Sequence, residues 1–125
     1  LDRMKVVCGL IVAALSTGCS KNSDVEAFIK VNDARAADLK DKAGKEGPEA
    51  VKKAFDAKKE DLRSRYAEIK TARGFQVSAE NKKSLGESVK MSTTAICGLQ
   101  VKVIMDRDKS KAYSEICKEY SSLFK

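Results

Sequence analysis

Apolar residues recur at helical spacing in four stretches of the chain, and charged or polar residues fill the positions between them. The first stretch predicts a helix over 24–43, with Ser23 and Glu26 as a capping box at its start and Gly44 and Gly47 at its end. Its apolar face consists of Val25, Phe28, Ile29, Ala36 and Leu39, and Asn32 interrupts it.

The second stretch predicts a helix over 49–73, with Pro48 at its first position and Gly74 as its C-cap. Its apolar positions are separated by steps of 4, 7, 4 and 3 residues, and they are Val51, Phe55, Leu62, Tyr66 and Ile69. Acidic residues stand four positions before basic ones on the other face, which stabilises an exposed helix surface.

A third helix is predicted after the cap residue Ser78 and the short apolar connection 75–77. Gly86 and Gly98 have two interpretations: they allow a neighbouring helix to approach closely, or they mark a bend near Gly98. The predicted buried positions are Leu85, Val89, Ile96, Leu99 and Val103. A fourth helix is predicted over 109–123, with Asp108 as cap and an apolar side formed by Tyr113, Ile116, Tyr120 and Leu123 or Phe124.

Each predicted helix has one apolar face, and none is apolar all round. Such faces are buried by packing against one another. Short connections between successive helices favour antiparallel neighbours. The sequence therefore predicts an all-α fold, a small antiparallel bundle of about four helices with up-down-up-down topology.

The N-terminal segment has the pattern of an export signal. Lys5 precedes ten residues that are apolar or glycine, at 6–15, and this run is shorter than the roughly 20 residues that a membrane-spanning helix needs. The segment 15–19 then resembles the lipobox of bacterial lipoproteins, in which a small residue precedes a lipidated cysteine. Gly18 and Cys19 match the lipobox, and Ser16 departs from it, since leucine is usual at that position.

The resemblance implies cleavage before Cys19 and attachment of acyl chains, palmitate among them, to Cys19. The expected organisation is a signal peptide at 1–18, a lipidated tether at 19–23 and a helical bundle domain at 24–125. Ser20, directly after the lipidated cysteine, resembles the sorting signal that directs lipoproteins to the periplasmic face of the outer membrane. Lys21 resembles the inner-membrane retention signal of some bacteria.

Four cysteines are present, and two remain once Cys8 leaves with the signal peptide and Cys19 is acylated. An even number of cysteines in an exported chain predicts a disulfide, here between Cys97 and Cys117. The predicted turn at 106–108 lies midway between them, so an antiparallel hairpin brings them to the same height.

The chemistry of the side chains argues against catalysis. The chain has no histidine, which excludes Ser–His–Asp and Cys–His mechanisms and removes the commonest metal ligand. No phosphate-binding glycine motif occurs, so no cofactor and no metal site is expected. The net charge of +7 favours anionic surfaces, but acidic residues are interleaved with the basic ones. An exported protein also rarely meets DNA, so nucleic acid is not an expected partner.

These observations predict a lipid-anchored, non-catalytic protein-interaction module of the cell envelope, similar in kind to pilotins and to immunity or exclusion lipoproteins. The expected partners are the bilayer, through acylated Cys19, and another envelope protein. The alternative is a structural lipoprotein that binds anionic envelope surfaces through its basic charge. The candidate contacts, unless all are core residues, are Tyr66, Phe75, Tyr113, Tyr120 and Phe124.

Overall fold

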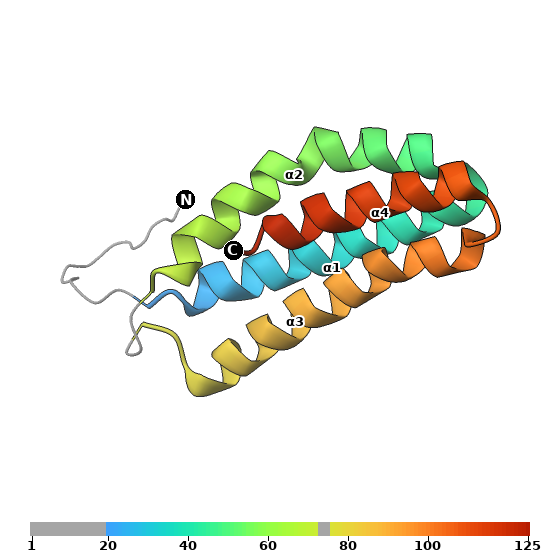
Figure 1. The fold of residues 1–125 in the computed structure, drawn as a ribbon. Coiled ribbons are helices and arrows are strands. Elements are labelled where there is room, and N and C mark those ends of the chain that lie inside the picture. The colour runs from blue at the N-terminus through green and yellow to red at the C-terminus, as the bar shows by residue number, and fades with distance from the viewer. Residues whose placement is uncertain (1–19, 73–75) are drawn as a thin grey trace.

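Four α-helices and one short 3-10 helix make up residues 20–72 and 76–125, the residues that the computed structural model describes (Figure 1). No strand occurs within these two ranges. In chain order the elements are α1 (Asn22–Lys45), α2 (Pro48–Lys70), α3 (Ala79–Cys97), η1 (Gly98–Val103) and α4 (Arg107–Ser122).

The helices run up, down, up and down, so that α1 and α3 begin at the end of the bundle where α2 and α4 finish (Figure 1). Helix α1 packs against α2 and α3, and α4 also packs against α3 and α2. Helices α2 and α3 therefore lie diagonally opposite each other. The predicted all-α, four-helix bundle is confirmed.

Two of the predicted helix starts are confirmed. The Ser78 hydroxyl accepts a hydrogen bond from the Asn81 backbone N–H at 3.1 Å, which makes Ser78 the cap of α3. Pro48 is the first residue of α2, and Gly47 before it has a φ of 108°, a left-handed conformation that glycine adopts without strain.

The other two predicted starts are wrong. Helix α1 begins at Asn22, because the Val25 N–H already bonds to the Lys21 carbonyl, so Ser23 lies inside the helix and forms no capping box. Helix α4 is capped by Asp106, whose carboxylate accepts from the Lys109 N–H at 3.1 Å. Asp108 instead lies in the first turn, where its charge suits the positive end of the helix.

Two of the predicted helix ends also shift. Helix α1 continues through Gly44 to Lys45, and the chain then bends at Glu46, whose N–H bonds to the Lys42 carbonyl at 2.7 Å. Helix α2 ends at Lys70, three residues earlier than predicted. The predicted C-cap Gly74 lies outside the described residues.

The predicted apolar faces meet in one core. Val77, in the connection before α3, is buried as well. The buried hydrophobic residues are Val25, Phe28, Ala36, Leu39, Val51, Phe55, Leu62, Ile69, Val77, Ile96, Leu99, Tyr113, Ile116, Tyr120 and Leu123. Leu85, Val89 and Val103, which were predicted to be buried, are partly buried at its edge.

A disulfide joins α3 to α4, as predicted. Cys97 is the last residue of α3, and it is bonded to Cys117 with the two Cα atoms 4.7 Å apart. Directly after Cys97 the helix tightens from α to 3-10 geometry, starting at Gly98. The close-approach interpretation of the glycines is wrong, since a Cβ added at Gly86 or Gly98 would meet nothing within 4 Å.

Candidate functional site

A polar network crosses the middle of the core. Asn32 of α1 is fully buried, and its amide nitrogen donates to the Ser92 hydroxyl at 2.9 Å and to the Ser88 hydroxyl at 3.1 Å, both on α3. The Tyr120 hydroxyl of α4 donates to the amide oxygen of Asn32. Three helices are thus joined at one side chain.

The two serine hydroxyls that accept from Asn32 also donate hydrogen bonds of their own. The Ser88 hydroxyl donates to a carboxylate oxygen of Asp33 at 2.7 Å, and the Ser92 hydroxyl donates to the Val89 carbonyl at 3.1 Å. Burial raises the pKa of Tyr120 to about 12, so its hydroxyl remains a donor at neutral pH. A satisfied buried network of this kind fixes the register of the helices.

Sequence reasoning noted the Asn32 interruption but not the network. The sequence did hold a signal: Asn32 is a polar residue on the apolar face of one predicted helix, and Ser88 and Ser92 stand four positions apart on another. The pairing itself joins residues 56 and 60 positions apart in the chain, which periodicity within a single helix does not reveal.

An open groove of about 460 Å³ lies between the first turns of α2 and the first half of α4. Its apolar side is formed by Pro48, Ala112 and Ile116, and a neighbouring hollow of about 360 Å³ continues it past Pro48 and Ala112 toward the bundle end. The full lining of the larger hollow is Pro48, Glu49, Lys52, Lys53, Asp56, Ala112, Glu115 and Ile116.

An ion-pair network crosses from α2 to α4 beside this groove. Lys52 Nζ lies 2.8 Å from both Asp56 and Glu119, and Lys59 Nζ lies 3.1 Å from the same two residues. These contacts lower the pKa of Glu119 and Asp56 and raise the pKa of both lysines, because hydrogen bonds favour the charged forms. The four charges balance one another.

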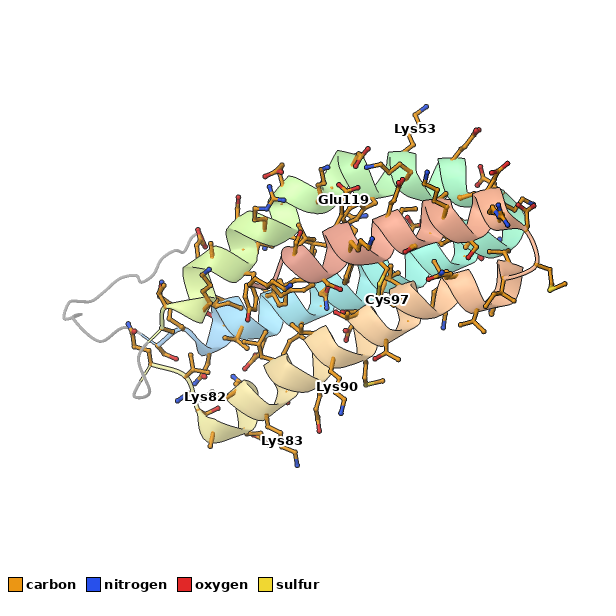
Figure 2. All side chains as sticks on the ribbon, in the orientation of Figure 1. Lys53, Lys82, Lys83, Lys90, Cys97 and Glu119 are labelled. Carbon is orange, nitrogen blue, oxygen red and sulfur yellow. A yellow bond between two sulfur atoms is a disulfide. The ribbon has the colours of Figure 1, made fainter. Side chains whose placement is uncertain are left out.

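Other charges at the groove are not balanced in this way. Within the described residues, Glu49, Lys53 and Glu115 have no ion pair. Lys53 points away from the bundle into solvent (Figure 2). The groove therefore combines an apolar side with charges of both signs that are free to meet those of a ligand.

The aromatic residues predicted as partner contacts lie mostly in the core. Tyr113 and Tyr120 are buried, because α4 turns these positions toward the other three helices, so they are not surface contacts. Tyr66 and Phe124 are partly buried, and their rings pack edge to face with centroids 5.2 Å apart. Phe75 and the lipidation candidate Cys19 lie outside the described residues.

A surface that sequence reasoning missed lies along the end of α3, η1 and the following turn. Its large apolar side chains are exposed: Met91 by 71%, Val101 by 67%, Ile104 by 65% and Met105 by 97%. The available signal was charge: Lys102 is the single charged residue in the segment 91–105, although charged residues make up 34% of the chain. Exposed apolar side chains that lie close along the chain make this segment a candidate contact surface.

Neither a membrane-spanning helix nor a cluster of metal ligands occurs in the part of the chain that the structure describes. No helix there is long and apolar enough to cross a membrane. No group of three or more cysteine and carboxylate side chains is arranged there to hold a metal ion.

The chain was also compared with known proteins. No family model, no curated protein and no solved structure matches it.

Proposed function

We propose that the protein is a lipid-anchored, non-catalytic interaction module of the cell envelope, which binds another envelope protein through the groove between α2 and α4. The observation that carries the proposal is the groove itself, which has an apolar side formed by Pro48, Ala112 and Ile116 and unpaired charges at Glu49, Lys53 and Glu115. Protein partners are commonly recognised by such a combination of apolar contact and peripheral charge.

The lipid anchor is supported by the sequence before the bundle and by the disulfide within it. Cys19, in its lipobox-like context, stands three positions before Asn22, where α1 begins. The disulfide between Cys97 and Cys117 fits an exported protein, because such bonds persist in oxidising compartments. With Ser20 following the acylated cysteine, the proposed location is the periplasmic face of the outer membrane.

A binding role is supported over a catalytic one by the chemistry of the side chains. The chain has no histidine, and the carboxylates with lowered pKa beside the groove, Asp56 and Glu119, are paired with lysines. A catalytic acid or base needs a pKa near the working pH, and these shifts move the carboxylates away from it.

The anchor is tested by metabolic labelling with a fatty-acid probe in cells that produce the protein. The wild-type chain is expected to be labelled and to fractionate with membranes, and Cys19→Ser is expected to lose both properties. Equal labelling of the two forms would contradict acylation at Cys19.

The groove is tested by filling it. Ala112→Trp places a large ring against Pro48 and Ile116, and crosslinks to a partner in intact cells, identified by mass spectrometry, are expected to disappear. Ala37→Trp, on the exposed face of α1, is the matched control and is expected to keep the crosslinks. Crosslinks that survive Ala112→Trp in a folded protein would place the partner elsewhere.

A further inference from the structure

Exposed apolar side chains and unpaired lysines both occur along α3, η1 and the turn that follows. Val101, Ile104 and Met105 lie in or just after η1, and Met91 lies two turns earlier on α3. Lys82, Lys83 and Lys90 extend from α3 on the side that faces away from the other helices (Figure 2). This surface, defined by these seven residues and Lys102, is called the α3 face below.

In the described ranges, the lysines of the α3 face are unpaired, as are some but not all of the lysines on α1 and α2. Four lysines on α1 and α2, and Lys21 just before α1, form ion pairs with carboxylates between 2.8 and 3.9 Å away; the four are Lys42, Lys45, Lys52 and Lys59. Within the described residues, the four lysines of the α3 face have no ion pair. Glu80 and Glu87 of α3 are exposed as well, so it is the excess of four lysines over two carboxylates that is available to an anionic surface.

The α3 face starts beside the proposed anchor. The Lys21 N–H donates to the Gln76 carbonyl at 2.7 Å, and the Ser78 N–H donates to the Asn22 side chain at 2.9 Å. These bonds hold the chain just after residue 19 against the start of α3. From there α3 and η1 run to the far end of the bundle, about 40 Å away at the usual rise of α and 3-10 helices.

We infer that the α3 face lies on an anionic bilayer, with the lysines over the lipid headgroups and the side chains of Val101, Ile104 and Met105 inserted between them. This inference rests on the proposed anchor, which brings the start of α3 to the membrane. A bilayer is favoured over a protein partner because the face combines unpaired basic charge with projecting apolar side chains, the features by which a surface helix binds anionic lipid.

The arrangement is compatible with the proposed partner groove. Helix α2 lies diagonally opposite α3, so a bundle resting on its α3 face turns α2 away from the bilayer. Lys53, at the groove, and Lys83 and Lys90, on the α3 face, point to opposite sides of the molecule (Figure 2). One face thus contacts lipid while the groove stays open to the periplasm.

The test uses tryptophan as a reporter, since the chain contains none. Met105→Trp and the control Lys53→Trp are made in the full chain, and the acylated proteins are purified from cells and reconstituted into vesicles of phosphatidylcholine and phosphatidylglycerol. Vesicle flotation reports the anchor. We expect the emission of Met105→Trp to shift to the blue and to be quenched by lipids with brominated acyl chains, while Lys53→Trp keeps the emission of a tryptophan in water.

Charge is tested in the Met105→Trp background. Lys83→Glu with Lys90→Glu is expected to abolish the blue shift on anionic vesicles, and the matched pair Lys53→Glu with Lys58→Glu is expected to retain it. High salt is expected to weaken the shift, because it screens the lysines. An equal shift on pure phosphatidylcholine would overturn the role of the lysines.

The outcomes separate the two proposals. A protein that floats with vesicles but shows no shift at residue 105 overturns docking of the α3 face and leaves the anchor intact. A protein that does not float overturns the anchor and, with it, the membrane-facing position of α3. Photocrosslinking in intact cells from a probe at residue 105 to a protein, rather than to lipid, overturns the inference and assigns the face to that protein.

Discussion

The Tyr120 hydroxyl donates to the side-chain oxygen of Asn32, and this bond joins α4 to α1 across the core although each helix packs mainly on α2 and α3. Tyr120→Phe removes the donor and leaves the buried Asn32 oxygen without it. We expect a loss of about 1 to 3 kcal/mol in the free energy of unfolding, measured with urea. Tyr66→Phe is the control, because the partly buried Tyr66 is not in the network, and it should change stability by less than about 0.5 kcal/mol. Equal losses would show that the bond contributes nothing.

Stability is expected to fall at alkaline pH through Tyr120. Its pKa is raised from 10.0 to about 12 in the folded state, chiefly by burial, so the unfolded chain loses this proton first. The contribution is complete below about pH 10 and is lost between about pH 10 and pH 12, by up to about 3 kcal/mol. Unfolding measured across this range should be steeper in pH for the wild type than for Tyr120→Phe. Parallel profiles would contradict the assignment.

At acid pH the Glu119 ion pairs are expected to weaken. Hydrogen bonds from Lys52 and Lys59 lower the pKa of Glu119 below its usual 4.5, so their contribution is present above that pH and is lost as the carboxylate is protonated. Glu119 is 38% exposed, and solvent screening keeps the effect below about 1 kcal/mol. The free energy of unfolding should therefore fall less steeply below about pH 4.5 in Glu119→Gln than in the wild type, and high salt should have the same effect. An equal slope in the two proteins would show that other carboxylates dominate it.

Loss of the disulfide is expected to destabilise the bundle without changing its helices. Cys97→Ser with Cys117→Ser opens a link between residues 20 positions apart, which should lower the free energy of unfolding by about 3 kcal/mol. Thermal unfolding followed by circular dichroism measures the loss, and the starting helical signal should match the wild type. A reductant should lower the melting temperature of the wild type alone.

Two glycines are expected to respond in opposite directions to substitution by alanine. Gly86→Ala should stabilise the protein by about 0.5 to 1 kcal/mol, because the site is helical and a Cβ there meets nothing within 4 Å. Gly47→Ala should destabilise it by about 1 to 3 kcal/mol, because φ at this residue is 108°. Urea unfolding of both variants under one condition checks the contrast, and a shared sign would contradict it.

The sequence predicts the helices well because each apolar face is a local pattern. Val51, Phe55 and Leu62 repeat at helical spacing and are all buried. The disulfide is predictable for a similar reason, since the distances of Cys97 and Cys117 from the turn follow from the chain itself. Helix termini are less predictable. Asp106 and Asp108 are chemically equivalent caps, and the path of the chain out of η1 decides between them.

The buried polar network and the groove, which depend on contacts between separate helices, were beyond sequence reasoning. On α3, Ser88 and Ser92 are more buried than Leu85 and Val89, because Asn32 of α1 faces the two serines. The groove depends in the same way on how α2 and α4 pack together. Ala112 is an ordinary helical residue within its own helix, and its position in a hollow is set by another one.

The link between Cys97 and Cys117 also determines how the chain comes apart under proteolysis. A cut anywhere between these residues, in η1 or in the turn before α4, leaves two fragments that migrate as one band until a reductant is added. A cut at Glu46 or Gly47, between α1 and α2, releases a free N-terminal fragment under any condition. Gels run with and without reductant therefore distinguish a cut between Cys97 and Cys117 from a cut in the connection between α1 and α2.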